Sequence, residues 1–348
     1  MKILPSDNSY RTFCDLVGGY RMFRVMTEAV NAGIIDRLDD VDYSAAELLA
    51  GIALQPEEGG RFIETLVNVG LLEEYDGRLF LSRFSRAFLT RNSPDSQRRV
   101  LEFEPTLMGN WGRLGEVLRD GQGALVREQP QEGYHQRLEL FQGAMSEAAV
   151  VRSGELWDAL KELPERGTII DIGAGEGTYL REFLTRHPEW RGIACDLPDI
   201  CAQAGNAALP HNLTFYPVNI LERQELEVLV AGHRGTVDLL LFSNLCHCYS
   251  PEENCALMEQ TSDLLTDDGL LVVHDFYRDA NCFGALYDLH MLVNTWNGRS
   301  YTTAETAALL AGAGFPHHAI VELPSRSSAL VATRTVPYQS AAAFRPPR

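Results

Sequence analysis

Three closely spaced glycines and a following aspartate form the residue pattern best suited to binding a ligand. Gly173, Gly175 and Gly177 lie in the segment DIGAGEG, between the apolar run TIID and the helical run TYLREFL. Small residues between a strand and a helix let a ligand touch the backbone beside the helix N-terminus. Asp196 follows about twenty residues later, at the end of the next apolar run, where its carboxylate can accept hydrogen bonds from both hydroxyls of a ribose. Together, these residues predict an adenosine-containing cofactor.

The glycine spacing distinguishes between two such cofactors. Nicotinamide dinucleotides are bound by G-x-G-x-x-G, whereas here the third glycine comes one residue earlier, as G-A-G-E-G. Asp171 ends the strand directly before the loop, where it can reach the amino end of a methionine moiety directly or through water. The spacing therefore favours S-adenosylmethionine, and a plain strand-to-helix turn is the alternative.

A histidine between two cysteines is the second group that could do chemistry. Cys246, His247 and Cys248 are consecutive, and His274 and His290 fall on neighbouring elements, so a soft-metal site is one interpretation. We expect the three consecutive residues to end a strand, where alternate side chains point to opposite faces, and the sequence contains no C-x-x-C pair. The sequence therefore predicts no bound metal.

The elements that must position these residues follow a change of pattern after Gly167. Apolar β-rich runs alternate with amphipathic helices through residues 161–336, which indicates an α/β domain with a mostly parallel sheet covered by helices on both faces. We expect a Rossmann-like domain there. Residues 106–160 are predicted to be linking helices that contribute to a substrate pocket, and residues 337–348 a C-terminal tail.

Residues 1–105 are predicted to form a mostly helical domain. An amphipathic helix is expected from Tyr20 to Leu38, with an Asn-Ala-Gly break near its end. The segments SAAELLAGIAL and PEEGGRFIETLVNVGLL predict two further helices, and EEYDGRLFLS predicts a hairpin with an Asp-Gly turn. This order is typical of a winged-helix unit, but Glu57, Glu58 and Glu64 on its second helix disfavour DNA binding.

Composition limits the partners and the compartment. The chain has 348 residues and a formal net charge of -18, which disfavours a nucleic-acid partner because such affinity depends on Lys and Arg. No apolar run approaches the ~18 residues of a membrane span, and the first residues lack the apolar core of a signal peptide. Seven scattered cysteines favour reduced thiols over a disulfide framework. We expect a soluble, cytoplasmic protein without a membrane partner.

Segments throughout the chain resemble the small-molecule O-methyltransferases of the caffeic-acid and acetylserotonin type. The resemblance runs from Arg21 to about Ala332, with the motifs in the family's order and spacing. They are EAVNAGIIDRL, AAELLAGIAL, FIETLVNVGLLEE, DIGAGEGTYLREFLTRHPEWRGIACDLPDI, NLCHCYSPEENCALM, LTDDGLLVVHDF, DLHMLVNTWNGRSYT and AALLAGAGF. The resemblance implies a Rossmann-like S-adenosylmethionine-dependent methyltransferase domain behind a winged-helix-like dimerisation domain. It also implies a homodimer whose subunits both shape each pocket, a small aromatic acceptor with a reactive hydroxyl, and S-adenosylhomocysteine as product.

Family positions imply roles for individual residues. His247 would be the catalytic base that takes the acceptor's proton while the oxygen attacks the methyl carbon, and Asp275 would stabilise the resulting imidazolium. The implied cofactor contacts are Asp171, Gly173, Gly175, Gly177, Asp196, Leu197, Asn219, Ile220, Ser243 and Asn244. The implied substrate contacts are Trp111, Met145, His290, Met291 and Asn294.

Two positions near His247 depart from the family pattern. Ser300 stands where relatives carry a glutamate that orients the histidine, and Cys248 stands where they carry an aspartate. The segment Pro251–Cys255 also resembles a branch of the family that methylates carbon on a keto acid with histidine-bound iron. These departures leave two alternatives: a C-, N- or S-methyltransferase of the same family, or a catalytically degenerate homologue that binds a ligand.

Overall fold

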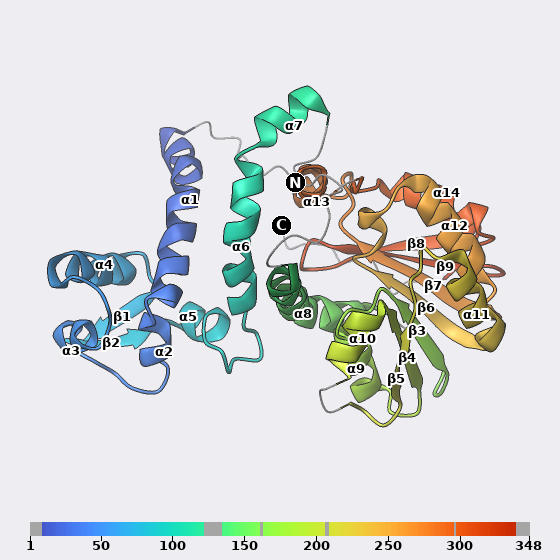
Figure 1. Cartoon of the computed structure of the whole chain (residues 1–348), viewed down its shortest axis with the longest axis horizontal. Helices are drawn as coiled ribbons and strands as arrows, with labels where there is room; N and C mark the ends of the chain where they lie inside the picture. Colours follow the sequence, from blue (N-terminus) through green and yellow to red (C-terminus); the bar gives the residue numbers. More distant parts are fainter. Residues whose placement is uncertain (1–8, 122–133, 161–162, 206–208, 296, 339–348) are drawn as a thin grey trace. The chain divides into compact units, whose positions relative to one another are not determined.

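The computed structural model of the chain describes residues 9–121, 134–160, 163–205, 209–295 and 297–338. The chain divides into two compact units, each described by itself below (Figure 1). The helical unit contains the residues up to Pro105 together with Glu139–Glu147, and the sheet unit contains Thr106–Leu138 and the chain from Ala148 onward. Most of the predicted C-terminal tail and part of the predicted linking segment lie outside the described residues.

The helical unit begins with α1 (Tyr10–Asn31), which starts well before the predicted Tyr20. Ser9 caps this helix, because its side chain accepts a hydrogen bond from the Thr12 backbone N–H at 3.2 Å. The adjacent Gly18 and Gly19 lower helix propensity, which is why the pattern alone does not extend the helix so far back. The predicted break is confirmed at Gly33, whose φ of 74° separates α1 from α2 (Ile34–Arg37).

The next elements agree with the predicted pair of helices and hairpin. They are α3 (Ala45–Ala50), α4 (Pro56–Asn68), β1 (Leu72–Tyr75) and β2 (Arg78–Leu81), followed by α5 (Arg83–Phe88). The strands pair antiparallel, and Asp76 and Gly77 form the turn with φ values of 49° and 74°. Buried Ile34, Leu48 and Leu66 join the hairpin in one apolar core.

Three helices follow: α6 (Arg98–Trp111), α7 (Leu114–Asp120) and α8 (Tyr134–Ala159). They lie in the stretch predicted to be helical, and α6 and α8 each contribute residues to both units. Within the helical unit, the guanidinium of Arg98 is buried and donates to Asp36 Oδ2 at 2.7 Å and to Glu102 Oε1 at 3.3 Å. The ion pair between buried Arg98 and the more exposed Asp36 joins α6 to α2.

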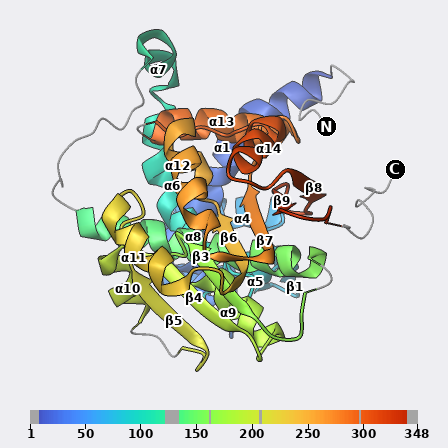
Figure 2. The same ribbon diagram turned by 90° about the vertical axis from the view of Figure 1, so that its right-hand side faces the viewer.

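A seven-stranded sheet in the order β5-β4-β3-β6-β7-β9-β8 forms the centre of the sheet unit. The parallel strands are β3 (Thr168–Ile172), β4 (Arg191–Asp196), β5 (Leu213–Pro217), β6 (Val237–Ser243) and β7 (Leu265–Asp275). The strands β8 (His317–Glu322) and β9 (Ser328–Thr333) are antiparallel, and Figure 2 shows β5 and β8 at opposite edges. The predicted Rossmann-like class, with a mostly parallel sheet, is confirmed.

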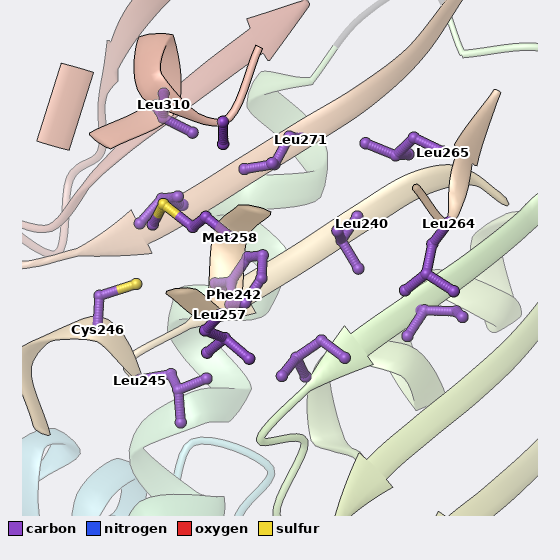
Figure 3. Packing of buried hydrophobic residues seen from close by; sticks show 14 of the residues in the cluster. Leu240, Phe242, Leu245, Cys246, Leu257, Met258, Leu264, Leu265, Leu271 and Leu310 are labelled. Carbon is purple, nitrogen blue, oxygen red and sulfur yellow. The ribbon is translucent and has the colours of Figure 1, made fainter. Parts of the chain in front are cut away.

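Helices cover both faces of this sheet. One face packs against α11 (Arg223–His233), α12 (Pro251–Ser262) and α14 (Thr303–Gly312). Figure 3 shows Leu257 and Met258 beside Phe242 of β6, and Leu310 beside Leu271 of β7. The other face packs against α8 and α9 (Thr178–Arg186). Alternate residues of β6 supply the two cores, as the strand period of two requires.

Two more helices, α10 (Pro198–Ala204) and α13 (Cys282–Asn294), complete the sheet unit. Among the described helices, none combines the length and apolar character needed to cross a bilayer. All seven cysteines are free thiols.

Candidate functional site

The predicted cofactor residues gather at the carboxyl ends of the parallel strands. The glycine loop follows β3, and β4, β6 and β7 end at Asp196, Ser243 and Asp275 respectively. The chain proceeds from β3 outward to β4 on one side and later returns to β6 on the other, so β3 and β6 flank the point where the strand order reverses. Open α/β sheets bind ligands in the crevice at this point.

The loop after β3 has a backbone that requires glycine. Gly173, Gly175 and Gly177 have φ values of 77°, 56° and 75°, in the left-handed region that side chains rarely adopt. A Cβ on Gly173 would also lie 2.5 Å from Leu245 Cδ1. The backbone N–H of Gly173 donates to the Cys195 carbonyl at 2.8 Å, which fastens the loop to β4. Gly177 is the N-cap of α9, so the loop leads directly into a helix N-terminus.

Asp171 at the end of β3 is fully buried and has no hydrogen-bond partner among the described residues. Neither of its carboxylate oxygens meets a donor there. Burial, helped by the charge of Asp196, raises the pKa of Asp171 well above its usual range. Buried carboxylates are normally paired, so this one is a place where the cation or N–H donor of a ligand would bind.

Asp196 already accepts two backbone hydrogen bonds. Its Oδ2 accepts from Gly175 and its Oδ1 from Leu197, both at 2.7 Å. These contacts fix the carboxylate against the loop, and each oxygen keeps a lone pair that can accept from a ribose hydroxyl. The Leu197 side chain is 47% exposed, as an apolar surface for a ligand would be.

The turn after β5 contains the two remaining predicted adenine contacts. Asn219 Oδ1 accepts a hydrogen bond from the Leu221 backbone N–H at 3.1 Å, and the Asn219 N–H donates to Glu225 at 2.7 Å. Asn219 and Ile220 are half-buried. The Asn219 amide nitrogen is left to donate to a ligand.

A buried polar network surrounds the end of β6. The Asn244 side-chain amide donates to the hydroxyls of Tyr179 and Ser243, both at 3.1 Å, whereas its buried Oδ1 lacks a partner among the described residues. Asn244 has a φ of 50°, an uncommon conformation for a residue other than glycine. His274 contacts the Tyr179 hydroxyl through Nδ1 at 3.1 Å and the Ser327 hydroxyl through Nε2 at 2.8 Å. Burial lowers the pKa of His274 to about 3, so it is a neutral structural histidine.

His247 and Asp275 form a short buried pair. His247 Nδ1 lies 2.6 Å from Asp275 Oδ1, and both side chains are buried. Burial by itself lowers the pKa of His247, but the attraction of the Asp275 carboxylate outweighs it, and the net effect raises the pKa well above its usual range. This pairing fixes the ring and directs Nε2 away from Asp275, so Nε2 is the nitrogen that can exchange a proton with a ligand.

The Tyr287 hydroxyl lies 3.4 Å from His247 Nε2. The two rings meet edge to face, with centroids 5.2 Å apart. Tyr287 also packs on Phe276, with centroids 4.6 Å apart. No sequence pattern predicts a role for Tyr287, although it lies one helical turn before the predicted contacts His290 and Met291 on α13.

The Cys-His-Cys segment is not the end of a strand, so that expectation was wrong. Cys246–Cys248 form a 3₁₀ helix after β6 has ended at Ser243. The chain turns there because Asn254 of α12 donates to the Cys246 and Tyr249 carbonyls at 2.8 and 3.3 Å. Across the described ranges, no group of three or more His, Cys, Asp or Glu side chains is arranged to hold a metal ion.

Four of the five predicted substrate residues lie in the sheet unit and form a connected set. Trp111 Nε1 donates to His290 Nδ1 at 3.3 Å, and the Asn294 amide donates to the His290 carbonyl at 3.0 Å. Asn110, which was not predicted, donates to Asn294 Oδ1 at 2.9 Å. Met291 is buried beside them on α13. Met145 belongs to the helical unit and is 38% exposed.

His290 stacks on Tyr287, with ring centroids 5.4 Å apart and an interplanar angle of 13°. Burial and the nearby charge of His247 lower the pKa of His290. The substrate set is therefore continuous with the His247–Asp275 pair through Tyr287.

Ser300, which the resemblance places at the position of the family glutamate, forms no side-chain hydrogen bond with His247. Its Oγ is buried and has no partner within the described part of the chain, and its backbone N–H donates to Asp288 Oδ1 at 2.8 Å. Asp275 is thus the carboxylate that contacts His247 here.

Comparison with known proteins gives consistent similarities. Residues 131–316 match the O-methyltransferase domain family. The chain is 25% identical over 308 residues to the 3-hydroxy-5-methyl-1-naphthoate 3-O-methyltransferase of Streptomyces sahachiroi, covering 86% of this chain and 88% of that protein. It is 25% identical over 330 residues to the acetylserotonin O-methyltransferase of Macaca mulatta, covering 89% and 93% respectively. The crystal structure of human N-acetylserotonin methyltransferase in complex with SAM shares the fold, with a TM-score of 0.83, 21% identity and coverage of 96% and 100%.

Proposed function

The chain belongs to the O-methyltransferase family, and from that premise we propose that it transfers the methyl group of S-adenosylmethionine to a hydroxyl of a small aromatic metabolite, with His247 as the general base. The names of the two relatives, a hydroxynaphthoate and an acetylserotonin O-methyltransferase, support an aromatic acceptor. The family match favours oxygen as the acceptor atom over carbon, nitrogen or sulfur, and favours an enzyme over a degenerate ligand-binding homologue.

The observation that carries the proposal is the fully buried carboxylate of Asp171 beside a glycine loop, without a partner among the described residues. S-adenosylmethionine bears an ammonium and a sulfonium, so the residues fit this cofactor. Asp171 would hold the ammonium end directly or through water, and Asp196 would hold the ribose. Leu197 and Ile220 would contact the adenine, with Asn219 at its polar edge. When bound, the cofactor supplies a methyl group on a positively charged sulfur, which is a good leaving group.

His247 acts on the acceptor rather than on the cofactor. A phenol has a pKa of about 10 and is a weak nucleophile at neutral pH, so a base that removes its proton during attack raises the rate. Asp275 holds the His247 ring through Nδ1 and leaves Nε2 to take that proton. Trp111, His290, Met291 and Asn294 would orient the acceptor, because transfer requires the oxygen in line with the breaking bond.

We further propose that the enzyme works as a homodimer in the cytoplasm and that the helical unit carries the dimer contact. Support for the dimer comes from α1, where Tyr10, Phe13, Val17 and Tyr20 recur at helical spacing and are 46–79% exposed. Exposed apolar stripes of this kind mark interaction surfaces. The seven free thiols fit a reducing compartment.

Calorimetry with S-adenosylhomocysteine tests the cofactor assignment. The wild-type protein should bind it, and Asp196→Ala should weaken binding about 10-fold or more, because hydrogen bonds to a charged group are lost. Asp199→Ala, which removes a nearby exposed carboxylate from α10, is the matched control and should bind like the wild type. A folded wild-type protein that takes up no S-adenosylhomocysteine would refute the proposed function.

A further inference from the structure

A positive charge lies beside the candidate site without a counter-ion among the described residues. The guanidinium of Arg152, on α8, sits over the ring of Phe276 at 4.7 Å from its centroid. Phe276 is buried, and Arg152 itself is half-buried. Stacking on a ring orients a guanidinium but does not neutralise it.

Arg152 forms no ion pair with any described residue, although acidic residues outnumber basic ones by 48 to 30 in the sequence. Some arginines of the sheet unit are ion-paired, such as Arg186 with Asp158 at 2.6 Å and Arg278 with Glu305 at 2.8 Å. Arg334 stacks on Phe315 but also donates to the Leu265 carbonyl at 3.2 Å, whereas no hydrogen bond of this kind is found for Arg152 among the described residues. The acid one turn along α8, Glu155, instead accepts the Ser325 backbone N–H at 2.8 Å. Partly buried charges are usually paired, so the missing anion is a feature that needs an explanation.

Arg152 is linked both to the His247 side of the site and to the polar network at the end of β6. On the His247 side, Phe276 packs against Tyr287, whose hydroxyl contacts His247. The charge of Arg152 also acts on Tyr179, whose hydroxyl accepts a hydrogen bond from Asn244. Burial raises the pKa of Tyr179 to about 12 and also raises that of Tyr287, and the charge of Arg152 opposes both shifts. The positive charge of Arg152 therefore acts on the hydroxyls of both Tyr179 and Tyr287.

We propose that Arg152 is the anchor for a ligand carboxylate in this site. The inference rests on the proposed function and adds the chemical class of group that the pocket recognises. A guanidinium binds a carboxylate through two parallel N–H···O bonds, and stacking on Phe276 holds it in one plane for that contact. Two sources can supply the group: the methionine carboxylate of the cofactor, or a carboxylate on the aromatic acceptor.

Binding and transfer measurements with Arg152→Gln distinguish these sources. The first arm compares binding of S-adenosylhomocysteine with binding of 5′-methylthioadenosine, which lacks the amino-acid portion. The second arm compares methyl transfer to hydroxyaryl acids, such as 3-hydroxy-1-naphthoate and 4-hydroxybenzoate, with transfer to their carboxamides. Arg152→Lys keeps the charge and should restore part of any loss. Arg223→Gln, which removes a side chain that is 77% exposed, is the control for a general change of charge.

Arg152→Gln should lose about 10- to 100-fold in one arm only. A loss for S-adenosylhomocysteine without a loss for 5′-methylthioadenosine assigns the cofactor carboxylate to Arg152. A wild-type preference for acids over amides that disappears in Arg152→Gln assigns the acceptor carboxylate. The proposal is overturned if the variant binds both nucleosides like the wild type and the wild type shows no preference for acids. That result leaves the proposed function intact, because wild-type binding of S-adenosylhomocysteine tests it separately.

Discussion

The contact between His247 and Asp275 should determine how activity depends on pH. Their 2.6 Å contact is buried, and the carboxylate raises the pKa of His247 well above its usual range despite the opposing effect of burial. A general base must be neutral to accept a proton, so kcat/KM should increase as pH rises through this elevated pKa and should fall below it. A pH profile of kcat/KM with the wild-type enzyme and a verified acceptor measures this rise.

Asp275→Asn should shift this rise in kcat/KM toward lower pH, because it removes the largest of the effects that raise the pKa of His247 against burial. His247→Ala should reduce kcat by about 10²- to 10⁴-fold and abolish the rise of kcat/KM with pH that His247 causes. Asp279→Asn changes a carboxylate that hydrogen-bonds Thr303 instead, and it should keep the wild-type profile. Unchanged kcat/KM in His247→Ala would show that another group takes the proton.

Sequence motifs identify some residues of the site and miss those that converge from separate elements. His247 and Asp275 occupy recognisable positions, and the structure brings them together. Tyr287 and Arg152 carry no local signal, because their places beside His247 and Phe276 depend on how α13 and α8 pack around the ends of β6 and β7. One chain read alone contains no information on such long-range contacts.

At the scale of elements, the turn from β3 into α9 depends on glycine at position 173. Gly173→Ala should lower the free energy of unfolding by about 1–2 kcal/mol, since L residues disfavour left-handed backbone. A further loss should come from the contact at 2.5 Å between the new Cβ and Leu245 Cδ1. Denaturant unfolding measures the change, and S-adenosylhomocysteine binding should weaken in parallel because the loop shifts.

Gly232→Ala provides the comparison for that variant. Gly232 lies within α11 and does not have a positive φ, and a methyl group added to it would have open space around it. Alanine there should stabilise the helix by about 0.5–1 kcal/mol and leave ligand binding unchanged. If both variants unfolded alike, the left-handed conformation would not be what selects glycine at position 173.

Apolar patterns predict elements whose faces are buried and fail for segments that stay exposed. The alternation of strands and helices after Gly167 appears in the sheet as predicted, because both faces of β6 are buried against helices. The first turns of α1 escape prediction because glycines interrupt a face that stays exposed. The 3₁₀ helix at Cys246–Cys248 resembles a strand end in the sequence, because side-chain hydrogen bonds from Asn254, which lies further along the chain, shape it.

At the scale of the whole molecule, assembly should depend on the apolar face of α1. Phe13 and Val17 are 59% and 46% exposed and lie one turn apart on that helix. Exposing this face to water is unfavourable, and burying it against a second copy would remove the cost. We therefore expect wild-type dimers in sedimentation equilibrium and monomers for the double variant Phe13→Glu and Val17→Glu.

The matched control is Val228→Glu, which places a charge on a valine of α11 that is 65% exposed in the sheet unit. It should remain dimeric, because general surface charge does not separate subunits whose contact lies elsewhere. The family resemblance implies that both subunits shape each pocket, so the double variant should also lose methyl transfer while its sheet unit still binds S-adenosylhomocysteine. A wild-type monomer at micromolar concentration, or a double variant that stays dimeric, would contradict a dimer built on α1. If the double variant binds S-adenosylhomocysteine but does not transfer methyl groups, the defect lies in the acceptor pocket. The cofactor residues, which are the loop after β3, Asp171 and Asp196, all belong to the sheet unit.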